Sequence, residues 1–386
     1  DDGYIVNGGQ SASGYTNWGA TDVIGIAMDL DNHKLYFSVD GTYINSGNPA
    51  NGTGSVFNLV QNTRYAPYIG FQGSSGFVFD VNTGQRAFNT SAPTGFVALQ
   101  QDNLPETSKG ISGLTWTKDR DGTSSWMCID SSRIYSAEGV PAALNLNNTN
   151  KEYGQVDFTD GINKFLKGGF AVATKNNSYS YMNKSGNSNL SYCWVGNSGT
   201  TASNGSGSIT STVQANTTAG FSIVQYVGTG SSGSVGHGLS AAPDWMIFKD
   251  RDTDSTNWRV YHKSIGGITK YLVLNTTAAP ATASMWGAPT TSVFIIGGSG
   301  YEVNESSKNY VAYCWHEVEG YSKFGKYVGN GVADGPFVYL GFKPALIIFK
   351  SNNTTNWYTH DGKRDKINPV KALVDINTTA ADNSGY

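Results

Sequence analysis

Apolar and polar residues alternate between residues 24 and 39, and this alternation predicts a β-hairpin. The apolar positions are, in order, Ile24, Ile26, Met28, Leu30, Leu35, Phe37 and Val39. Every second side chain of a strand faces the same side of a sheet, so the positions fit two strands. Residues 31–34 between them are polar, as a turn requires, and Asp40-Gly41 predicts the next turn.

Two further apolar runs, at residues 65–71 and 77–81, also predict strands. They are followed by a segment, residues 91–105, that contains Pro93 and ends in Pro105. We expect a domain boundary there, because prolines interrupt regular structure. The first domain would be part of a β-sandwich spanning residues 1–105.

An internal repeat covers the remainder of the chain. Pro243-Asp-Trp-Met-Ile-Phe-Lys249 matches Pro344-Ala-Leu-Ile-Ile-Phe-Lys350, and each copy continues to an Asn-Thr-Thr-Ala-Ala sequence. A more divergent copy begins at Leu114-Thr-Trp-Thr-Lys118. The repeat predicts three β modules, a first at residues 106–235, a second at 236–341 and an incomplete third at 342–386.

The later half of the repeat contains a Tyr-Cys-Trp strand, at Tyr192-Cys193-Trp194 and again at Tyr313-Cys314-Trp315. A Tyr-Val-Gly sequence follows each, beginning at Tyr226 and at Tyr327. The third copy reaches Tyr386 without such a strand, and a half-built β module would leave strand edges unpaired. We therefore expect the polypeptide, or a partner in an assembly, to continue beyond these residues. The short first domain leads to the same expectation at the N-terminus.

Composition supports an all-β fold of tandem sandwich modules. Glycine numbers 48, aromatic residues make up 12% and charged residues only 14%, which is typical of strands joined by many turns. No stretch sustains the apolar spacing of an amphipathic helix. The net charge is −3 and the basic residues are scattered, so nucleic acid is not an expected partner. No apolar run is long enough for a membrane span, and no signal peptide is visible.

Residues 22–41 resemble the later half of a SPRY domain. In that family a Gly-x-Ala-x-Asp strand pairs with a strand that ends in Asn-Gly or Asp-Gly. The matching residues here are Gly25-Ile-Ala27-Met-Asp29, Leu35-Tyr-Phe37 and Asp40-Gly41. The resemblance implies a β-sandwich; the first half of the pattern, with some loops of the family's peptide-binding surface, is absent.

The following residues resemble structural proteins of tailed bacteriophages, notably marine ones. Residues 79–105, with Gly84-Gln85-Arg86, are similar to a segment that follows SPRY-like domains in such proteins. The repeat resembles repeats in phage tail-fibre and virion proteins. The residues that carry this second resemblance are Gly341-Phe-Lys-Pro344, Trp357, Lys363-Arg-Asp365 and Asn368-Pro-Val370. Both resemblances imply a virion structural protein.

No motif predicts a metal, cofactor or catalytic residue. Asp250-Arg-Asp252-Thr-Asp254 has the alternate spacing of a calcium loop but lacks its later glycine and glutamate, so a solvated turn is favoured. Gly228-Thr-Gly230-Ser-Ser-Gly233 matches a dinucleotide motif by letter, without a helix after it. The five histidines are dispersed, and His262 and His360 follow repeat tryptophans at spacings typical of strand ends. A carboxylate pair for glycan cleavage is the enzymatic alternative, since its two members can lie far apart in sequence.

Most tryptophans recur with the repeat, and recurrence favours a place in the core over sugar stacking. They are Trp116, Trp126, Trp194, Trp245, Trp258, Trp315 and Trp357. Trp18, Trp286, Tyr179 and Tyr181 do not recur and are better candidates for an exposed contact surface, although none singles out a ligand site. Cys193 and Cys314 are predicted to be buried strand residues rather than disulfide partners.

These observations favour a non-enzymatic component of a phage virion, most simply a tail fibre or other projecting appendage that helps bind the host cell. The expected partners are further copies of the chain, other virion proteins and a bacterial surface glycan or protein. One alternative is a capsid decoration or vertex fibre with no adsorption role. Another is a secreted protein that binds or cleaves carbohydrate.

Overall fold

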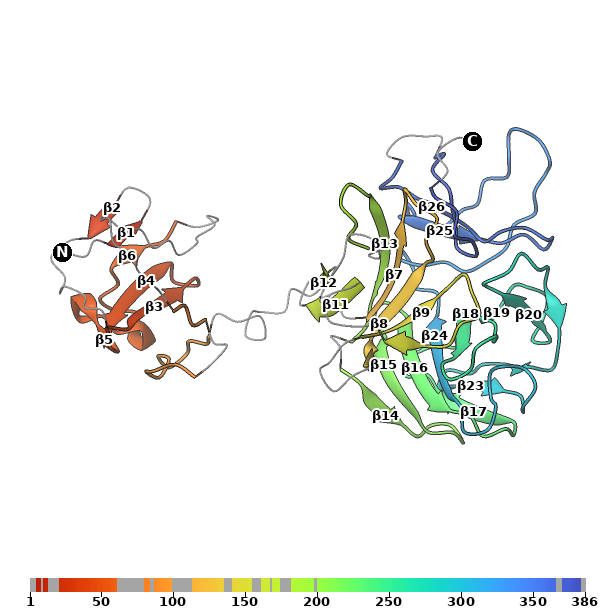
Figure 1. Ribbon diagram of the computed structural model, residues 1–386, viewed down its shortest axis with the longest axis horizontal. Helices are drawn as coiled ribbons and strands as arrows, with labels where there is room; N and C mark the ends of the chain where they lie inside the picture. The colour runs from red at the N-terminus through yellow and green to blue at the C-terminus, as the bar shows by residue number, and fades with distance from the viewer. Residues whose placement is uncertain are drawn as a thin grey trace. The chain divides into compact units, whose positions relative to one another are not determined.

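The computed structural model of the chain forms two compact units, Asp1–Pro105 and Glu106–Tyr386. The residues that it describes are 5–7, 10–12, 21–60, 80–83, 87–98, 113–134, 141–154, 161–166, 169–173, 182–197, 200–365 and 370–382. Figure 1 shows that the described elements are almost all strands. All strand pairings between them are antiparallel, so the predicted all-β fold is confirmed.

The predicted hairpin is present in the first unit. Strand β3 (Ile24–Asp29) pairs with β4 (Lys34–Val39), with Asp29 opposite Lys34 at the turn. The turn closes because the Asp29 carboxylate accepts a hydrogen bond from the Asn32 amide at 2.9 Å. The other elements of this unit are β1 (Ile5–Asn7), β2 (Gln10–Ala12), β5 (Thr42–Tyr43), β6 (Phe57–Asn58) and the 3-10 turns η1 (Ile44–Ser46) and η2 (Pro49–Asn51). The run predicted at 65–71 lies outside the described residues, as do residues 77–79.

Each repeat in the second unit begins with three consecutive antiparallel strands. In repeat 1 these are β7 (Gly113–Asp119), β8 (Met127–Ile134) and β9 (Pro141–Asn145). In repeat 2 they are β18 (Trp245–Asp250), β19 (Arg259–His262) and β20 (Lys270–Val273). In repeat 3 they are β25 (Leu346–Phe349), β26 (Tyr358–Asp361) and β27 (Val374–Asp375).

The Tyr-Cys-Trp sequences form the strand beside the first strand of their repeats. Strand β13 (Asn189–Val195) pairs with β7, and β24 (Asn309–Trp315) pairs with β18. The other edge of β24 pairs with β16 (Phe221–Val227), which belongs to the segment predicted as module 1. A single eight-stranded sheet therefore runs across residue 235, so modules 1 and 2 share a sheet.

Shorter strands extend or cover these sheets. They are β10 (Tyr153–Gly154), β11 (Gly161–Leu166), β12 (Gly169–Ala173), β14 (Ala202–Asn204), β15 (Ser211–Asn216), β17 (Gly233–Gly236), β21 (Ala281–Thr282), β22 (Trp286–Gly287) and β23 (Val293–Ile296). The sheet β17-β23-β22 packs on the eight-stranded sheet through Phe294, Phe248 and Val224, which is a sandwich arrangement.

A central core joins all three repeats. It contains aliphatic and aromatic residues from each, including Leu144 of repeat 1, Val260 of repeat 2 and Val374 of repeat 3. The recurring tryptophans Trp116, Trp126, Trp245, Trp258, Trp315 and Trp357 are buried in this core, and Trp194 packs against it, so their predicted core role is confirmed.

Candidate functional site: the contacts that join the three repeats

Three buried tryptophans join the repeats in a closed cycle. The indole Nε1 of Trp126, in repeat 1, donates to the carbonyl of Asp375 in repeat 3 at 2.8 Å. Trp258 of repeat 2 donates to Asn145 of repeat 1 at 2.8 Å, and Trp357 of repeat 3 donates to Val273 of repeat 2 at 2.9 Å. Each repeat thus gives one hydrogen bond to a neighbour and receives one from the other neighbour.

In every repeat, an asparagine at the equivalent position accepts a hydrogen bond from the tryptophan backbone. Asn147, Asn275 and Asn377 accept a hydrogen bond from the backbone amide of Trp126, Trp258 and Trp357, respectively, at 2.7–2.9 Å. These asparagines begin the Asn-Thr-Thr sequences or their counterpart, which explains why the tryptophan and the asparagine recur together.

Three lysines form a second cycle in the same direction. Nζ of Lys118 donates to Thr379 at 3.1 Å, Nζ of Lys249 to Thr149 at 3.2 Å and Nζ of Lys350 to Thr277 at 3.3 Å, in each case to a backbone carbonyl of the neighbouring repeat. Each lysine also donates to carbonyls of the loop after its own strand. The lysine that closes the recurring apolar strand is therefore a connector between repeats.

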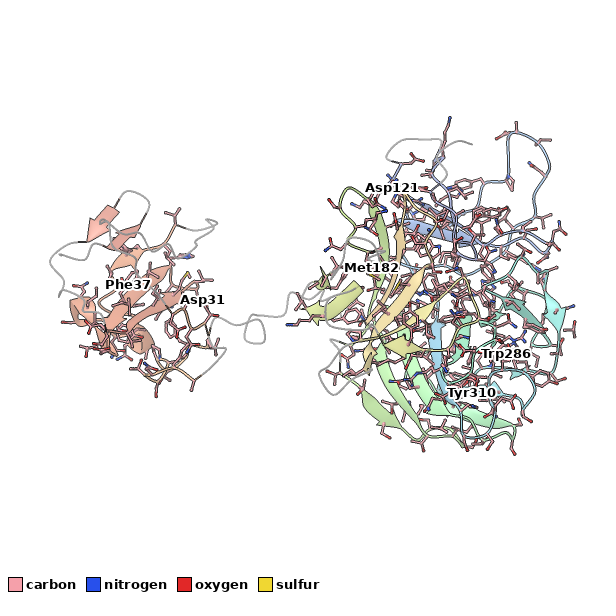
Figure 2. All side chains as sticks on the ribbon, viewed as in Figure 1. Asp31, Phe37, Asp121, Met182, Trp286 and Tyr310 are labelled. Atoms are coloured by element: carbon pink, nitrogen blue, oxygen red, sulfur yellow. The ribbon has the colours of Figure 1, made fainter. Side chains whose placement is uncertain are left out.

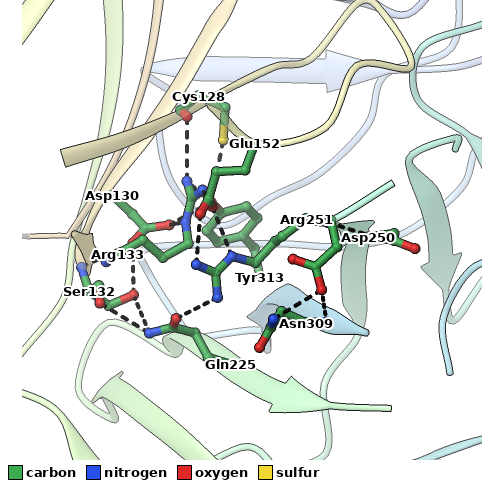
Figure 3. A network of polar contacts seen from close by, with 11 residues as sticks. Cys128, Asp130, Ser132, Arg133, Glu152, Gln225, Asp250, Arg251, Asn309 and Tyr313 are labelled. Atoms are coloured by element: carbon green, nitrogen blue, oxygen red, sulfur yellow. Dashed lines mark hydrogen bonds and ion pairs between the residues drawn. The ribbon is translucent and has the colours of Figure 1, made fainter. Parts of the chain in front are cut away.

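A buried network of charged and polar side chains lies where repeats 1 and 2 meet (Figure 3). The Arg133 guanidinium pairs with Asp130 at 2.6 Å and also with Glu152. Glu152 pairs in turn with Arg251 of repeat 2 at 2.7 Å. The Tyr313 hydroxyl, from β24, donates to Asp130 at 2.6 Å and accepts from Arg133 at 3.1 Å.

A second network of the same design joins repeats 3 and 1. Arg364 pairs with Asp361 at 2.5 Å and with Asp382 at 2.8 Å, and Asp382 pairs with Arg120 of repeat 1 at 2.7 Å. The Tyr192 hydroxyl, from β13, lies 3.2 Å from the Asp361 carboxylate. The backbone contacts of the two networks match as well. The backbone amide of Asp382 donates to the Arg120 carbonyl, and the backbone amide of Glu152 donates to the Arg251 carbonyl.

Each place where two repeats meet is called a corner below. The third corner, between repeats 2 and 3, carries different residues at the equivalent positions. Strand register places His262 opposite Trp245, in the position that Asp130 has opposite Leu114 and Asp361 has opposite Leu346. Ile265 stands three residues after His262, where the other two repeats have an arginine. Ile265 packs against the central core, and the His262 ring lies 6.4 Å from the ring of Phe324. This corner therefore has no Asp-Arg pair at the equivalent positions, and its ion pairs join Lys263 to Asp244 and Glu317 instead.

The surroundings of the first network favour its ionised form. Burial would raise the pKa of Asp130, but the Arg133 guanidinium and the Tyr313 hydrogen bond outweigh it and hold that pKa below its usual value. Burial acts in the same way on Glu152, and Arg133 with Arg251 lowers its pKa. Such a network binds the repeats together and stays charged through the neutral range.

Burial lowers the pKa of Lys249 to about 8. Between pH 8 and the ordinary lysine value near 10.5, the folded chain has released this proton while the unfolded chain still holds it. The free energy of unfolding should therefore rise with pH in this window. The measurement is the difference between the parent chain and a Lys249→Met variant in urea unfolding from pH 7 to pH 10.5. A difference that stays constant or falls as pH rises contradicts the prediction.

The acidic turn considered for calcium uses its carboxylates within the protein. Asp250 accepts hydrogen bonds from the amides of Asp252 and Thr253, as in a turn. Asp252 accepts from the Asn309 amide at 2.7 Å, and Asp254 forms an ion pair with Lys151. Among the described residues, no group of three His, Cys, Asp or Glu side chains is arranged to hold a metal ion. The glycines at 228–233 connect β16 to β17, with no helix between these strands.

The histidines occupy separate places. His262 and His360, which sequence spacing makes comparable, are not equivalent in the sheets, because His360 precedes Asp361 and lies opposite Ile347. Both lie at or next to the end of a strand, as expected, and both are half-buried. His237 is buried, and its Nδ1 accepts a hydrogen bond from the Leu239 amide.

Two predictions of exposure and burial are wrong. Trp286, which is labelled in Figure 2, was predicted to be exposed but is only 6% exposed, because it lies in β22 of the second sheet layer and packs on Phe248 and Tyr261 of the eight-stranded sheet. Cys193 is in a strand as predicted but is exposed, whereas Cys314 is buried. Cys314 is covered by the sheet β17-β23-β22, which packs on the eight-stranded sheet. In repeat 1, strand β11 instead contributes Ile162 to a cluster over β8 and β9. Trp18, Tyr179 and Tyr181 lie outside the described residues.

Sequence reasoning did not identify the charged residues of the two networks as a set. The signal available was the recurrence of an Asp-x-x-Arg spacing after two of the repeat tryptophans, at Asp130 and at Asp361. In the part of the chain that the structure describes, no helix is long and apolar enough to cross a membrane.

Comparison with protein families gave a match over most of the chain. The model of a family described as a domain of unknown function, DUF7483, matches residues 96–385, which is most of the chain. This range includes all three repeats and both networks. Neither the curated proteins nor the solved structures gave a match.

Proposed function

The chain belongs to the DUF7483 family, and we propose that it is a structural component of a bacteriophage virion, a tail fibre or other projecting appendage that helps bind the host cell. The observation that carries this proposal is the closed cycle of contacts between repeats. The charged residues Asp130, Arg133, Glu152 and Arg251 form ion pairs with one another. We infer that these charges join the repeats and do not act on a substrate.

Two features suit a part that must keep its form outside a cell. The tryptophan and lysine cycles connect segments far apart in sequence, such as Trp126 and Asp375, so that no repeat can separate without breaking buried hydrogen bonds. Loops between the strands, such as residues 325–339, are exposed and can vary without disturbing the core. The resemblance of the repeat to phage tail-fibre repeats supports the same assignment.

The test is cryo-electron microscopy of particles that carry this protein, with its density assigned by an antibody fragment raised against the purified chain. We expect labelled density at the tail, in a copy number that follows the tail symmetry. Density confined to the capsid contradicts a role in attachment, and a particle without the label contradicts the virion assignment.

A second measurement addresses host binding directly. The purified chain, added in excess to host cells, should compete with intact particles and slow their adsorption at least tenfold. An unrelated all-β protein at the same concentration is the control. Unchanged adsorption, with the label on the tail, restricts the chain to a structural role.

A further inference from the structure

A serine and a histidine from two separate segments of the second unit lie side by side. Ser240 lies in the connection between β17 and β18, and His316 directly follows β24. Oγ of Ser240 is 3.4 Å from Nε2 of His316. Ser240 is exposed, whereas His316 is only 7% exposed. The serine is therefore within reach of a molecule in solution, and the ring beside it is held within the protein.

The other ring nitrogen of His316 fixes where the proton of the ring lies. Nδ1 is 2.8 Å from the backbone carbonyl of Glu317. A carbonyl can only accept a hydrogen bond, so in the neutral ring Nδ1 carries the proton and Nε2 has a free electron pair. The Ser240 hydroxyl is then the donor to Nε2, at a length that is often seen in a catalytic pair without its substrate. His316 is thus oriented as a general base toward the serine.

Backbone contacts anchor both segments close to this pair. The backbone amide of His316 donates to the Gly220 carbonyl at 2.9 Å. Gly220 has a φ of +64°, and a Cβ there would lie 3.1 Å from Cε1 of the His316 ring, so this glycine leaves room for the imidazole. The connection that carries Ser240 is fixed at Asp244, whose amide donates to the Trp315 carbonyl at 2.7 Å. The protein therefore positions the histidine and the serine from both sides.

The other histidines of the second unit use their ring nitrogens differently. Both ring nitrogens of His237 are taken by backbone groups, and Nδ1 of His262 accepts from a backbone amide. Nδ1 of His360 donates to a backbone carbonyl, as in His316, but the His360 ring stacks on Phe349, with 5.8 Å between the ring centroids. Among the residues that the structure describes, His316 is the histidine whose Nε2 meets a serine hydroxyl.

We propose that Ser240 and His316 are the nucleophile and the general base of an activity that hydrolyses carboxylic esters, in addition to the structural role of the chain. Oγ of Ser240 attacks the carbonyl carbon of the ester while its proton passes to Nε2 of His316. The bond to the alcohol oxygen then breaks, and the leaving alcohol takes that proton. Water next attacks the acyl-serine and gives a proton to Nε2. The serine oxygen leaves with this proton, which releases the carboxylic acid and restores Ser240.

The group that orients the histidine favours esters over amides. A carboxylate behind the ring would stabilise the imidazolium that forms during the reaction, as in a Ser-His-Asp triad. Here the ring is held by the backbone carbonyl of Glu317, which carries only a partial charge, while the Glu317 carboxylate pairs with Lys263 and Lys323. An ester depends less on this stabilisation, because an alcohol is a better leaving group than an amine.

The test is the hydrolysis of p-nitrophenyl acetate by the full chain, together with covalent labelling by a fluorophosphonate probe. We expect the label on Ser240, located by mass spectrometry of peptides. Ser240→Ala should abolish the labelling and lower the rate of hydrolysis by about a hundredfold or more, because it removes the nucleophile. Ser299→Ala changes another exposed serine and should leave the labelling and the rate unchanged.

A matched pair of histidine variants tests the general base. His316→Gln should lower the rate of hydrolysis by about a hundredfold or more, whereas His360→Gln should leave it unchanged. If His316→Gln does not fold, the position of the label and the rate of Ser240→Ala decide. A parent chain that hydrolyses the ester no faster than Ser240→Ala, or a label that is absent or lies on another residue, overturns the proposal. This result does not depend on where the chain lies on a virion, so the activity can fail while the proposed function holds.

Discussion

Replacement of Arg133 by isoleucine is expected to lower the free energy of unfolding of the second unit by about 3–5 kcal/mol. Arg133 is the centre of the network between repeats 1 and 2, and its side chain and that of Asp130 are fully buried. Without the guanidinium, Asp130 keeps a charge in a medium that solvates it poorly. Urea unfolding at pH 7, followed by tryptophan fluorescence, measures the change.

The third corner supplies the matched control for this variant. A double variant, Asp130→His with Arg133→Ile, copies the residues at positions 262 and 265 and removes both members of the pair. It should be less destabilised than Arg133→Ile alone, because no buried charge is left without its partner, and Glu152 retains Arg251. A double variant whose cost equals the sum of the two single variants would show that the pair is not coupled, contrary to this account.

The networks also show where sequence reasoning reached its limit. Alternation of apolar residues between Ile24 and Val39 is a local signal, and it predicted the hairpin correctly. The repeat located the core tryptophans, since a residue that recurs with the fold usually packs its interior. Arg133 and Tyr313 are 180 residues apart in the sequence, and the residues around each of them do not predict their contact. An Asp-x-x-Arg sequence by itself is typical of a solvated turn.

Strand register also shows which histidine is equivalent to Asp130 and Asp361, which the spacing in the sequence does not. His262 and His360 follow their tryptophans by four and three residues and look comparable in sequence. The sheets instead make His262 equivalent to Asp130 and Asp361. One residue of offset moves a side chain to the opposite face of a strand, so an approximate match in spacing does not identify a shared role. The error for Trp286 has a related cause, because the repeat does not predict the second sheet layer to which Trp286 belongs.

The third corner differs from the other two in the residues that stand at the positions of the Asp-Arg pair. In the first two, a tyrosine from the Tyr-Cys-Trp strand is fixed by an ion pair. In the third, Phe324 packs against Trp245 at 6.1 Å beside His262. A buried ion pair stabilises little more than a well-packed apolar group of similar volume.

The tryptophan cycle gives the second large expected effect. Trp258→Ala should lower the free energy of unfolding by about 3–5 kcal/mol, because it removes a fully buried indole from the core shared by the repeats. Trp258→Phe keeps most of the apolar contact but leaves the Asn145 carbonyl without its donor, which should cost about 1–3 kcal/mol for that group. Thermal and urea unfolding of both variants provide the values.

Trp286 is the matched control for the hydrogen bond. It is buried to a similar degree, but its Nε1 has no hydrogen-bond partner among the residues that the structure describes, so Trp286→Phe loses packing alone. We expect Trp258→Phe to be the more destabilised of the two, and Trp126→Phe and Trp357→Phe to resemble it, because all three indoles occupy the same place in the cycle. If the four phenylalanine variants lose equal stability, the indole hydrogen bonds do not join the repeats, and packing alone holds the three together.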